Sequence, residues 1–132
     1  MDQGPLVEQQ LEAGIRFLSE FHKYAPVQIA FWLKETDEGA WYLYVASDQI
    51  TDENCDDGYG EVVRIMAMMR DPWLDMFQVK LIGADEPLAK AVTDLQRRYP
   101  SRTPARFFNK TFGYISAEEV CIYPSPIPAP VS

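Results

Sequence analysis

Residues 27–47 contain two strand-like runs joined by a turn, and this stretch limits the folds that are open to the chain. Apolar side chains recur at every second position along residues 27–34 and again along residues 41–47, which is the period of a β-strand. β-branched and aromatic residues dominate both runs, as strands prefer. Thr36-Asp37-Glu38-Gly39 fits a three-residue hairpin loop with Gly39 at positive φ. We therefore predict a β-hairpin.

This loop length predicts the register of the hairpin. Closing the chain over residues 37–39 pairs Phe31 with Val45 and Leu33 with Leu43, so these side chains share one face. The other face then carries a second apolar set, namely Ala30, Trp32, Tyr42, Tyr44 and Ala46.

Exposed apolar patches of this breadth are normally covered or used for contact. We therefore expect Trp32, Tyr42 and Tyr44 to form an interface. Two coverings compete on this surface: the segment after Pro100 folding back over the sheet, or a second protomer or other protein partner. In the second case the chain is a homodimer or part of a protein complex.

Hydrophobic periodicity extends the prediction to the rest of the chain. Helices are expected at residues 5–23, 51–70 and 85–99, and further strands at 76–82, 106–108 and 120–123. In the first helix the apolar stripe is Val7, Leu11, Ile15, Leu18 and His22, with Phe17 off it; in the third strand Phe77, Val79 and Leu81 point inward.

This order of elements is typical of an α+β domain. We predict a mostly antiparallel or mixed sheet of four to five strands with three helices mainly on one face. The domain spans residues 1–123, and residues 124–132 form a Pro-rich tail.

Composition narrows the function classes. A chain of 132 residues with 47% hydrophobic and 24% charged residues is typical of one soluble globular domain. It contains no apolar run long enough to span a membrane. Two distant cysteines favour a reducing compartment, so we expect a cytoplasmic protein. A net charge of −8 argues against general affinity for nucleic acid.

The charge is nevertheless uneven. Residues 90–110 contain one acidic and six basic residues, interleaved with Tyr99, Phe107 and Phe108. Arginine with aromatic rings suits a single-stranded nucleic acid or another phosphate-bearing ligand. The alternative is that these cations pair with the acidic remainder of the protein. The candidate anion-binding residues are Arg97, Arg98, Arg102, Arg106 and Lys110.

The sequence offers little support for catalysis. His22 is the only histidine, and Cys55 lies among acidic residues, which raise the pKa of a thiol. The acidic face of Glu53, Asp57 and Glu61 is explained by the positive end of a helix dipole without a metal. No glycine-rich phosphate loop is present, so we expect neither a metal nor another cofactor.

One enzyme motif remains as an alternative. Asp75, Gln78 and Lys80 resemble the acid, glutamine and lysine with which restriction-type nucleases hold a metal and assist the attacking water. Alternation places Gln78 and Lys80 on the solvent side of a strand, which favours a structural role. We therefore expect Asp75 and Lys80 not to converge, and we expect a non-catalytic binding or assembly module.

Overall fold

The computed structural model of the protein describes residues 4–125. Within that range the chain forms three α-helices, five strands and one short 3-10 helix. In chain order these elements are α1 (Glu8–Tyr24), β1 (Ile29–Glu35), β2 (Trp41–Ser47), α2 (Cys55–Met69), η1 (Met76–Gln78), β3 (Val79–Gly83), α3 (Pro87–Arg98), β4 (Ala105–Phe112) and β5 (Ile115–Ile122).

The five strands form one mixed sheet in the order β3-β2-β1-β5-β4. β2 and β3 are parallel, and the other neighbours are antiparallel. The α+β class and the mixed sheet built on a hairpin are therefore confirmed. The predicted Pro-rich tail lies largely outside the described residues, since only Pro124 and Ser125 belong to them.

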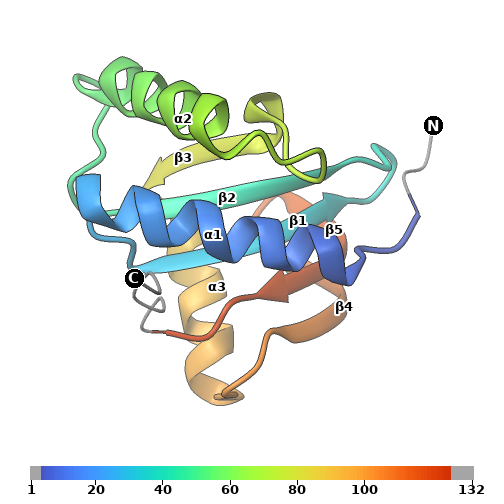
Figure 1. The fold of residues 1–132 in the computed structure, drawn as a ribbon. Helices are drawn as coiled ribbons and strands as arrows, with labels where there is room; N and C mark the ends of the chain where they lie inside the picture. The colour runs from blue at the N-terminus through green and yellow to red at the C-terminus, as the bar shows by residue number, and fades with distance from the viewer. Residues whose placement is uncertain (1–3, 126–132) are drawn as a thin grey trace.

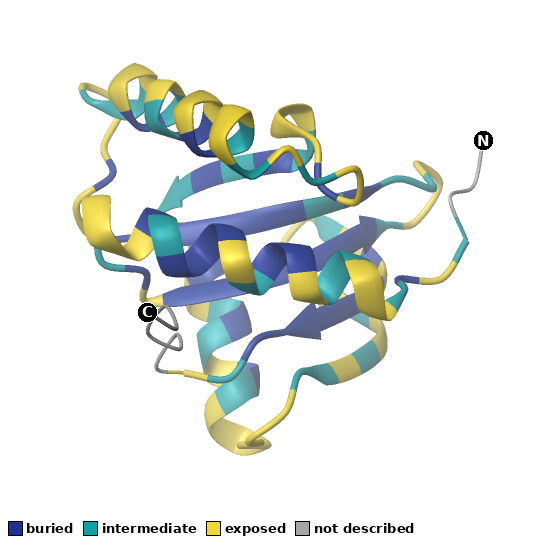
Figure 2. Ribbon diagram, viewed as in Figure 1, coloured by how far each residue is buried: buried dark blue, intermediate teal, exposed yellow. Residues whose placement is uncertain are grey.

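Helices cover both faces of the sheet. Figure 1 shows α1 and α2 side by side on the near face and α3 on the far face. Each face has its own core: Trp32, Leu43 and Val45 pack toward α1 and α2, whereas Phe31 and Tyr44 pack toward α3. β1, β2 and β5 are accordingly buried along most of their length, whereas the edge strand β4 is mostly exposed or half-buried. The helices expose one side each (Figure 2).

The hairpin register differs from the prediction by one residue. Phe31 pairs with Tyr44, and their rings stack with centroids 5.2 Å apart, whereas the pattern paired Phe31 with Val45. Both faces of the hairpin are buried. A one-residue slip therefore leaves no core side chain in solvent, and the apolar pattern alone does not fix the register.

The connection between β1 and β2 sets the register instead. Lys34 pairs with Trp41, so the loop is longer than the predicted three residues. Gly39 has a φ of 72°, as predicted, and Asp37 also has a positive φ, 78°. Two left-handed residues close this longer turn.

The buried face of α1 is rotated from the predicted stripe. Phe17 was expected off the stripe, but it is fully buried together with Phe21 and Leu18. His22 is exposed, and its Nδ1 accepts a hydrogen bond from the backbone N–H of Val27 at 3.0 Å. The histidine therefore links the end of α1 to the chain leading into β1.

The C-terminal half differs from the prediction at two places. β3 begins at Val79, because the preceding residues form η1, and Phe77 is 77% exposed instead of buried. The last two strands are longer than predicted. Ser116, Glu118 and Glu119 interrupt the apolar alternation of β5 and hide most of that strand from sequence patterns.

Candidate anion-binding surface

The basic segment begins on α3. Pro87 occupies the first turn, and the apolar stripe of Leu88, Val92 and Leu95 is buried against the sheet. The last turn therefore presents Arg97 and Arg98 to solvent. The helix dipole stabilises cations at a helix C-terminus. The positive charges of Arg97 and Arg98 are therefore favourable at this end of α3.

The connection after α3 adds an exposed arginine and an aromatic pair. Arg102 is exposed in the turn that leads to β4. Tyr99, which is 58% exposed, lies against Phe107 of β4 with ring centroids 5.8 Å apart. The end of α3 and the start of β4 therefore combine cations with an accessible ring.

Ion pairing distinguishes this segment from most of the other basic residues. Arg16, Lys23, Lys34 and Arg64 each pair with a carboxylate. Of the six basic residues at 90–110, only Arg106 forms an ion pair within the described part of the chain. Arg97, Arg98 and Arg102 are exposed and have no carboxylate partner among the described residues.

Arg106 was expected to be unpaired, and that expectation is wrong. Its Nη1 lies 2.8 Å from Oε2 of Glu119, and its Nη2 donates to the carbonyl of Leu6 at 2.9 Å. β4 pairs with β5 so that Arg106 lies opposite Cys121, on the α1 side of the sheet. The neighbouring Phe107 lies opposite Val120, on the α3 side. Arg106 thus belongs to a structural contact.

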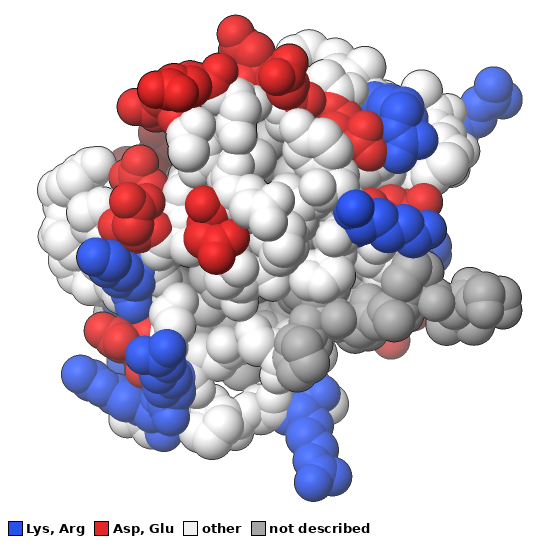
Figure 3. Space-filling model, turned by 90° about the vertical axis from the view of Figure 1, so that its left-hand side faces the viewer, with Lys and Arg blue, Asp and Glu red and all other residues white. Residues whose placement is uncertain are grey.

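Opposite charges occupy different parts of one face of the molecule. Figure 3 shows acidic side chains at the top, where α2 begins, and at the lower left a group of mainly Lys and Arg side chains with an acidic side chain among them. The first turn of α2 contains Asp56 and Asp57. The lower part of this face is therefore predominantly basic, although the net charge of the chain is −8.

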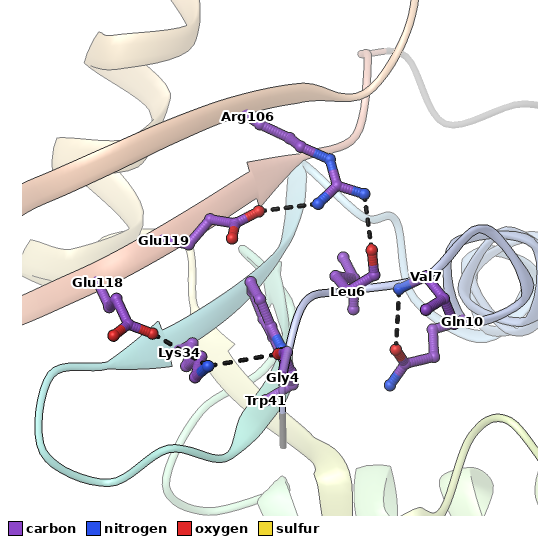
Figure 4. A network of polar contacts seen from close by, with 9 residues as sticks. All are labelled: Gly4, Leu6, Val7, Gln10, Lys34, Trp41, Arg106, Glu118 and Glu119. Carbon is purple, nitrogen blue, oxygen red and sulfur yellow. Dashed lines mark hydrogen bonds and ion pairs between the residues drawn. The ribbon is translucent and has the colours of Figure 1, made fainter. Parts of the chain in front are cut away.

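A second polar network, around Lys34, had no counterpart in the sequence interpretation. Lys34 is 5% exposed; its Nζ lies 3.0 Å from Oε2 of Glu118 and donates to the carbonyl of Gly4 at 3.3 Å. Trp41 Nε1 donates to the same carbonyl at 2.8 Å. Together with Arg106, these side chains hold the segment before α1 against the sheet (Figure 4). The signal in the sequence was a lysine that directly follows five apolar residues, Ile29–Leu33, in the same strand.

The predicted aromatic interface is not one surface. Trp32 is fully buried on the α1 side, where its Nε1 donates to Tyr123 Oη at 2.8 Å. Tyr44 is 5% exposed and packs on the α3 side, and Tyr42 is partly buried beside it. The register shift separates the tryptophan from the two tyrosines, and the chain's own helices cover both faces. Trp32 and Tyr44 are therefore unavailable to a partner.

The nuclease-like residues do not share a site. Asp75 caps η1 by accepting from the N–H of Phe77 at 2.9 Å, and Gln78 Oε1 accepts from the N–H of Asp75 at 3.0 Å. Lys80 Nζ lies over the ring of Tyr42, 4.2 Å from its centroid. The carboxylate and the amide are used in a cap, and the ammonium group rests on an aromatic ring.

The thiols are poorly suited to nucleophilic chemistry. Burial raises the pKa of the Cys55 thiol, and the negative charges of Asp56 and Asp52 raise it further. Burial also raises the pKa of Cys121 to about 11. Thiolates are therefore scarce at neutral pH at both positions.

The acidic face of α2 does not gather into a metal site. Glu61 is held by Arg64, at 2.9 Å and 2.6 Å, and this hydrogen bonding lowers the pKa of the Glu61 carboxyl. Within residues 4–125, no three His, Cys, Asp or Glu side chains are grouped closely enough to bind a metal ion. The same range contains no helix with the length and apolar character needed to cross a membrane.

Comparison with known proteins found no family model, curated protein or solved structure that matches this chain.

Proposed function

We propose that the protein is a non-catalytic binding module that holds single-stranded nucleic acid at the end of α3 and the start of β4. The observation that carries this proposal is the absence of ion pairs at three arginines of the segment. Arg97, Arg98 and Arg102 are exposed and lack a carboxylate partner among the described residues, whereas cations elsewhere in the chain are mostly paired.

The chemistry of the segment fits this ligand class. Guanidinium groups donate to phosphate oxygens in a bidentate geometry, and an accessible ring offers a surface on which a base can stack. Tyr99 supplies such a ring beside the arginines. Phe108 is a further exposed ring on β4, but it lies opposite Glu119 on the other face of the sheet from Phe107. A cytoplasmic location belongs to the same proposal, since Cys55 and Cys121 are free thiols.

Binding of a fluorescein-labelled dodecamer of uridine or deoxythymidine, followed by fluorescence anisotropy, tests the proposal. We expect weak binding whose affinity falls with salt, because each neutralised phosphate of a single strand contributes a slope of about −0.7 in log K against log salt concentration. Changing Arg97, Arg98 and Arg102 together to Gln should reduce the slope by roughly 2. Tyr99→Ala should cost about 1–3 kcal/mol of binding free energy.

The matched control changes three exposed, ion-paired cations on other surfaces, Arg16, Lys23 and Arg64, to Gln. Its net charge equals that of the first triple variant. If both triple variants bind equally, only the net charge matters and the proposed surface is wrong. Absence of binding by the unaltered protein at low salt would also reject the function.

A further inference from the structure

A cavity of about 280 Å³ lies between the start of α3, strand β3 and the turn that joins β4 to β5. It is separate from the proposed nucleic-acid surface, and none of the arginines of that surface lines it. Most of its wall is apolar and comes from Tyr44, Leu88, Phe112 and Ile115. Two charged side chains, those of Lys80 and Glu86, also line it.

The fold places these residues together for identifiable reasons. The parallel register of β2 and β3 sets Tyr44 beside Lys80. Phe112 and Ile115 pair at the β4–β5 turn, where Gly113 has a φ of 65°. Glu86 precedes the first turn of α3, so its side chain borders the cavity at the helix N-terminus.

Lys80 is the group that most strongly suggests a ligand. Its Nζ lies 4.2 Å from the ring centroid of Tyr42 and 5.6 Å from that of Tyr44, so two aromatic faces position the ammonium group. Among the described residues it has no carboxylate partner. An ammonium group that lines an apolar cavity gains from a carboxylate placed within the same cavity.

We propose that this cavity binds a small apolar monocarboxylate, with its carboxylate on Lys80 and its apolar body against Leu88, Phe112 and Ile115. Glu86 is the acidic residue of the lining and disfavours a second negative charge on the ligand. The volume is sufficient for a ligand of roughly ten non-hydrogen atoms. Tyr114, which also lines the cavity and is 94% exposed, stands at its mouth.

The test titrates the ¹⁵N-labelled protein with 3-phenylpropanoate and follows the amide resonances by NMR. The matched probes 3-phenylpropanol and 3-phenylpropylamine keep the apolar body and remove or reverse the charge. We expect the carboxylate to bind with a Kd of about 1 mM or weaker, given the size of the probe. Shifts should concentrate at residues 80–88 and 112–115, and the alcohol and the amine should bind at least about tenfold more weakly.

Two lysine variants complete the test. Lys80→Met keeps the apolar stem over the tyrosine rings and removes the charge, and we expect it to weaken 3-phenylpropanoate binding about tenfold or more. Lys90→Met removes a charge outside this cavity and should leave 3-phenylpropanoate binding unchanged. Lys80→Arg keeps the positive charge and should retain most of the affinity for 3-phenylpropanoate. A native-like amide spectrum verifies the fold of each variant.

Three outcomes would overturn the proposal. The first is no carboxylate binding at 20 mM probe. The second is equal affinity for the alcohol and the carboxylate. The third is unaltered carboxylate binding by a folded Lys80→Met variant. Each leaves Lys80 with a structural role, as a cation over Tyr42 and Tyr44. None depends on whether Arg97, Arg98 and Arg102 bind nucleic acid.

Discussion

Gly14 shows how the absence of one side chain lets α1 approach the sheet. A Cβ atom at this position would lie 2.1 Å from Tyr123 Oη, which is too close for any real contact. The hydroxyl occupies this space because it accepts from Trp32 Nε1 and donates to the carbonyl of Leu11, both at 2.8 Å. A buried hydrogen-bond chain from β1 to α1 therefore requires glycine here.

Gly14→Ala should lower the free energy of unfolding by about 1–3 kcal/mol, the usual cost of overpacking a core. Urea denaturation followed by circular dichroism measures it. The control is Gly60→Ala, since Gly60 lies in α2 and a Cβ there meets nothing within 4 Å. This change should stabilise the protein by up to about 1 kcal/mol through helix propensity.

The Tyr123→Phe background separates crowding from other effects of the Gly14 substitution. Removing the hydroxyl deprives Trp32 of its acceptor and should itself destabilise the fold. It also removes the atom with which a new Cβ would collide most closely. The cost of Gly14→Ala should therefore be smaller in this background. An equal cost in both backgrounds would argue against the contact described.

Among the elements, the segment before α1 depends on side chains from distant strands. Gly4 and Leu6 offer backbone carbonyls to Lys34, Trp41 and Arg106. These donors come from β1, β2 and β4, so strands from both halves of the chain hold this segment.

Arg106→Gln should release part of this segment. The shorter amide side chain cannot bond Glu119 and Leu6 in the way the guanidinium does. We expect hydrogen exchange to accelerate several-fold over residues 4–7 and to remain unchanged in β1, as measured by mass spectrometry of peptic fragments. Arg102→Gln removes an exposed arginine without an ion pair and serves as the control. Identical exchange in the two variants would contradict the assigned role of Arg106.

The order of the elements was predictable from the sequence, but the pairing of the hairpin was not. Patterns of apolar residues with a period of two, or of three to four, located the first three strands and the helices in the sequence. In β1 both faces are buried, since helices lie on each side of the sheet. The pattern then no longer distinguishes Phe31 paired with Val45 from Phe31 paired with Tyr44.

The candidate sites were predictable to different degrees. Charge clustering indicated the segment with Arg97, Arg98 and Arg102, but the partner of Arg106 lies on β5, a strand whose polar residues hid its extent. The carboxylate cavity was not foreseen. It depends on the parallel placement of Lys80 beside Tyr44, and long-range register of this kind leaves no local signal in a single sequence.

At the scale of the whole molecule, the sheet separates two cores, and both contain weak acids that are buried in neutral form. Burial, assisted by Glu35 and Glu38, raises the pKa of Tyr44 to about 12 on the α3 side. On the α1 side, burial raises the pKa of Cys121 to about 11 and also raises the pKa of Tyr123. In each case the folded state binds its proton more tightly than the unfolded state.

Alkaline conditions should therefore weaken the fold. The unfolded chain loses the thiol proton near pH 9.0, whereas the folded chain retains it to about pH 11. Stability is complete below pH 9 and declines as the pH rises through this window. The contribution of Cys121 is about 1–3 kcal/mol.

Guanidinium denaturation at pH 8, 9, 10 and 11 measures the decline. The Cys121→Ala variant should be less stable at pH 8, because it leaves a small cavity, and its stability should fall less steeply with pH. A free energy of unfolding that stays constant from pH 8 to pH 11 in the unaltered protein would contradict the assigned pKa directions.

The position of β5 between β1 and β4 also has a consequence for biosynthesis. The hydroxyl that accepts the Trp32 hydrogen bond belongs to a residue 91 positions further along the chain. At about 5–20 residues per second, a ribosome needs roughly 5–20 s to synthesise that interval. Throughout this time the nascent chain carries a complete, strongly apolar β1 with one edge open, the kind of edge that pairs with other chains. This edge of β1 is paired only after β5 has been synthesised. Until then the nascent chain depends most on protection from aggregation.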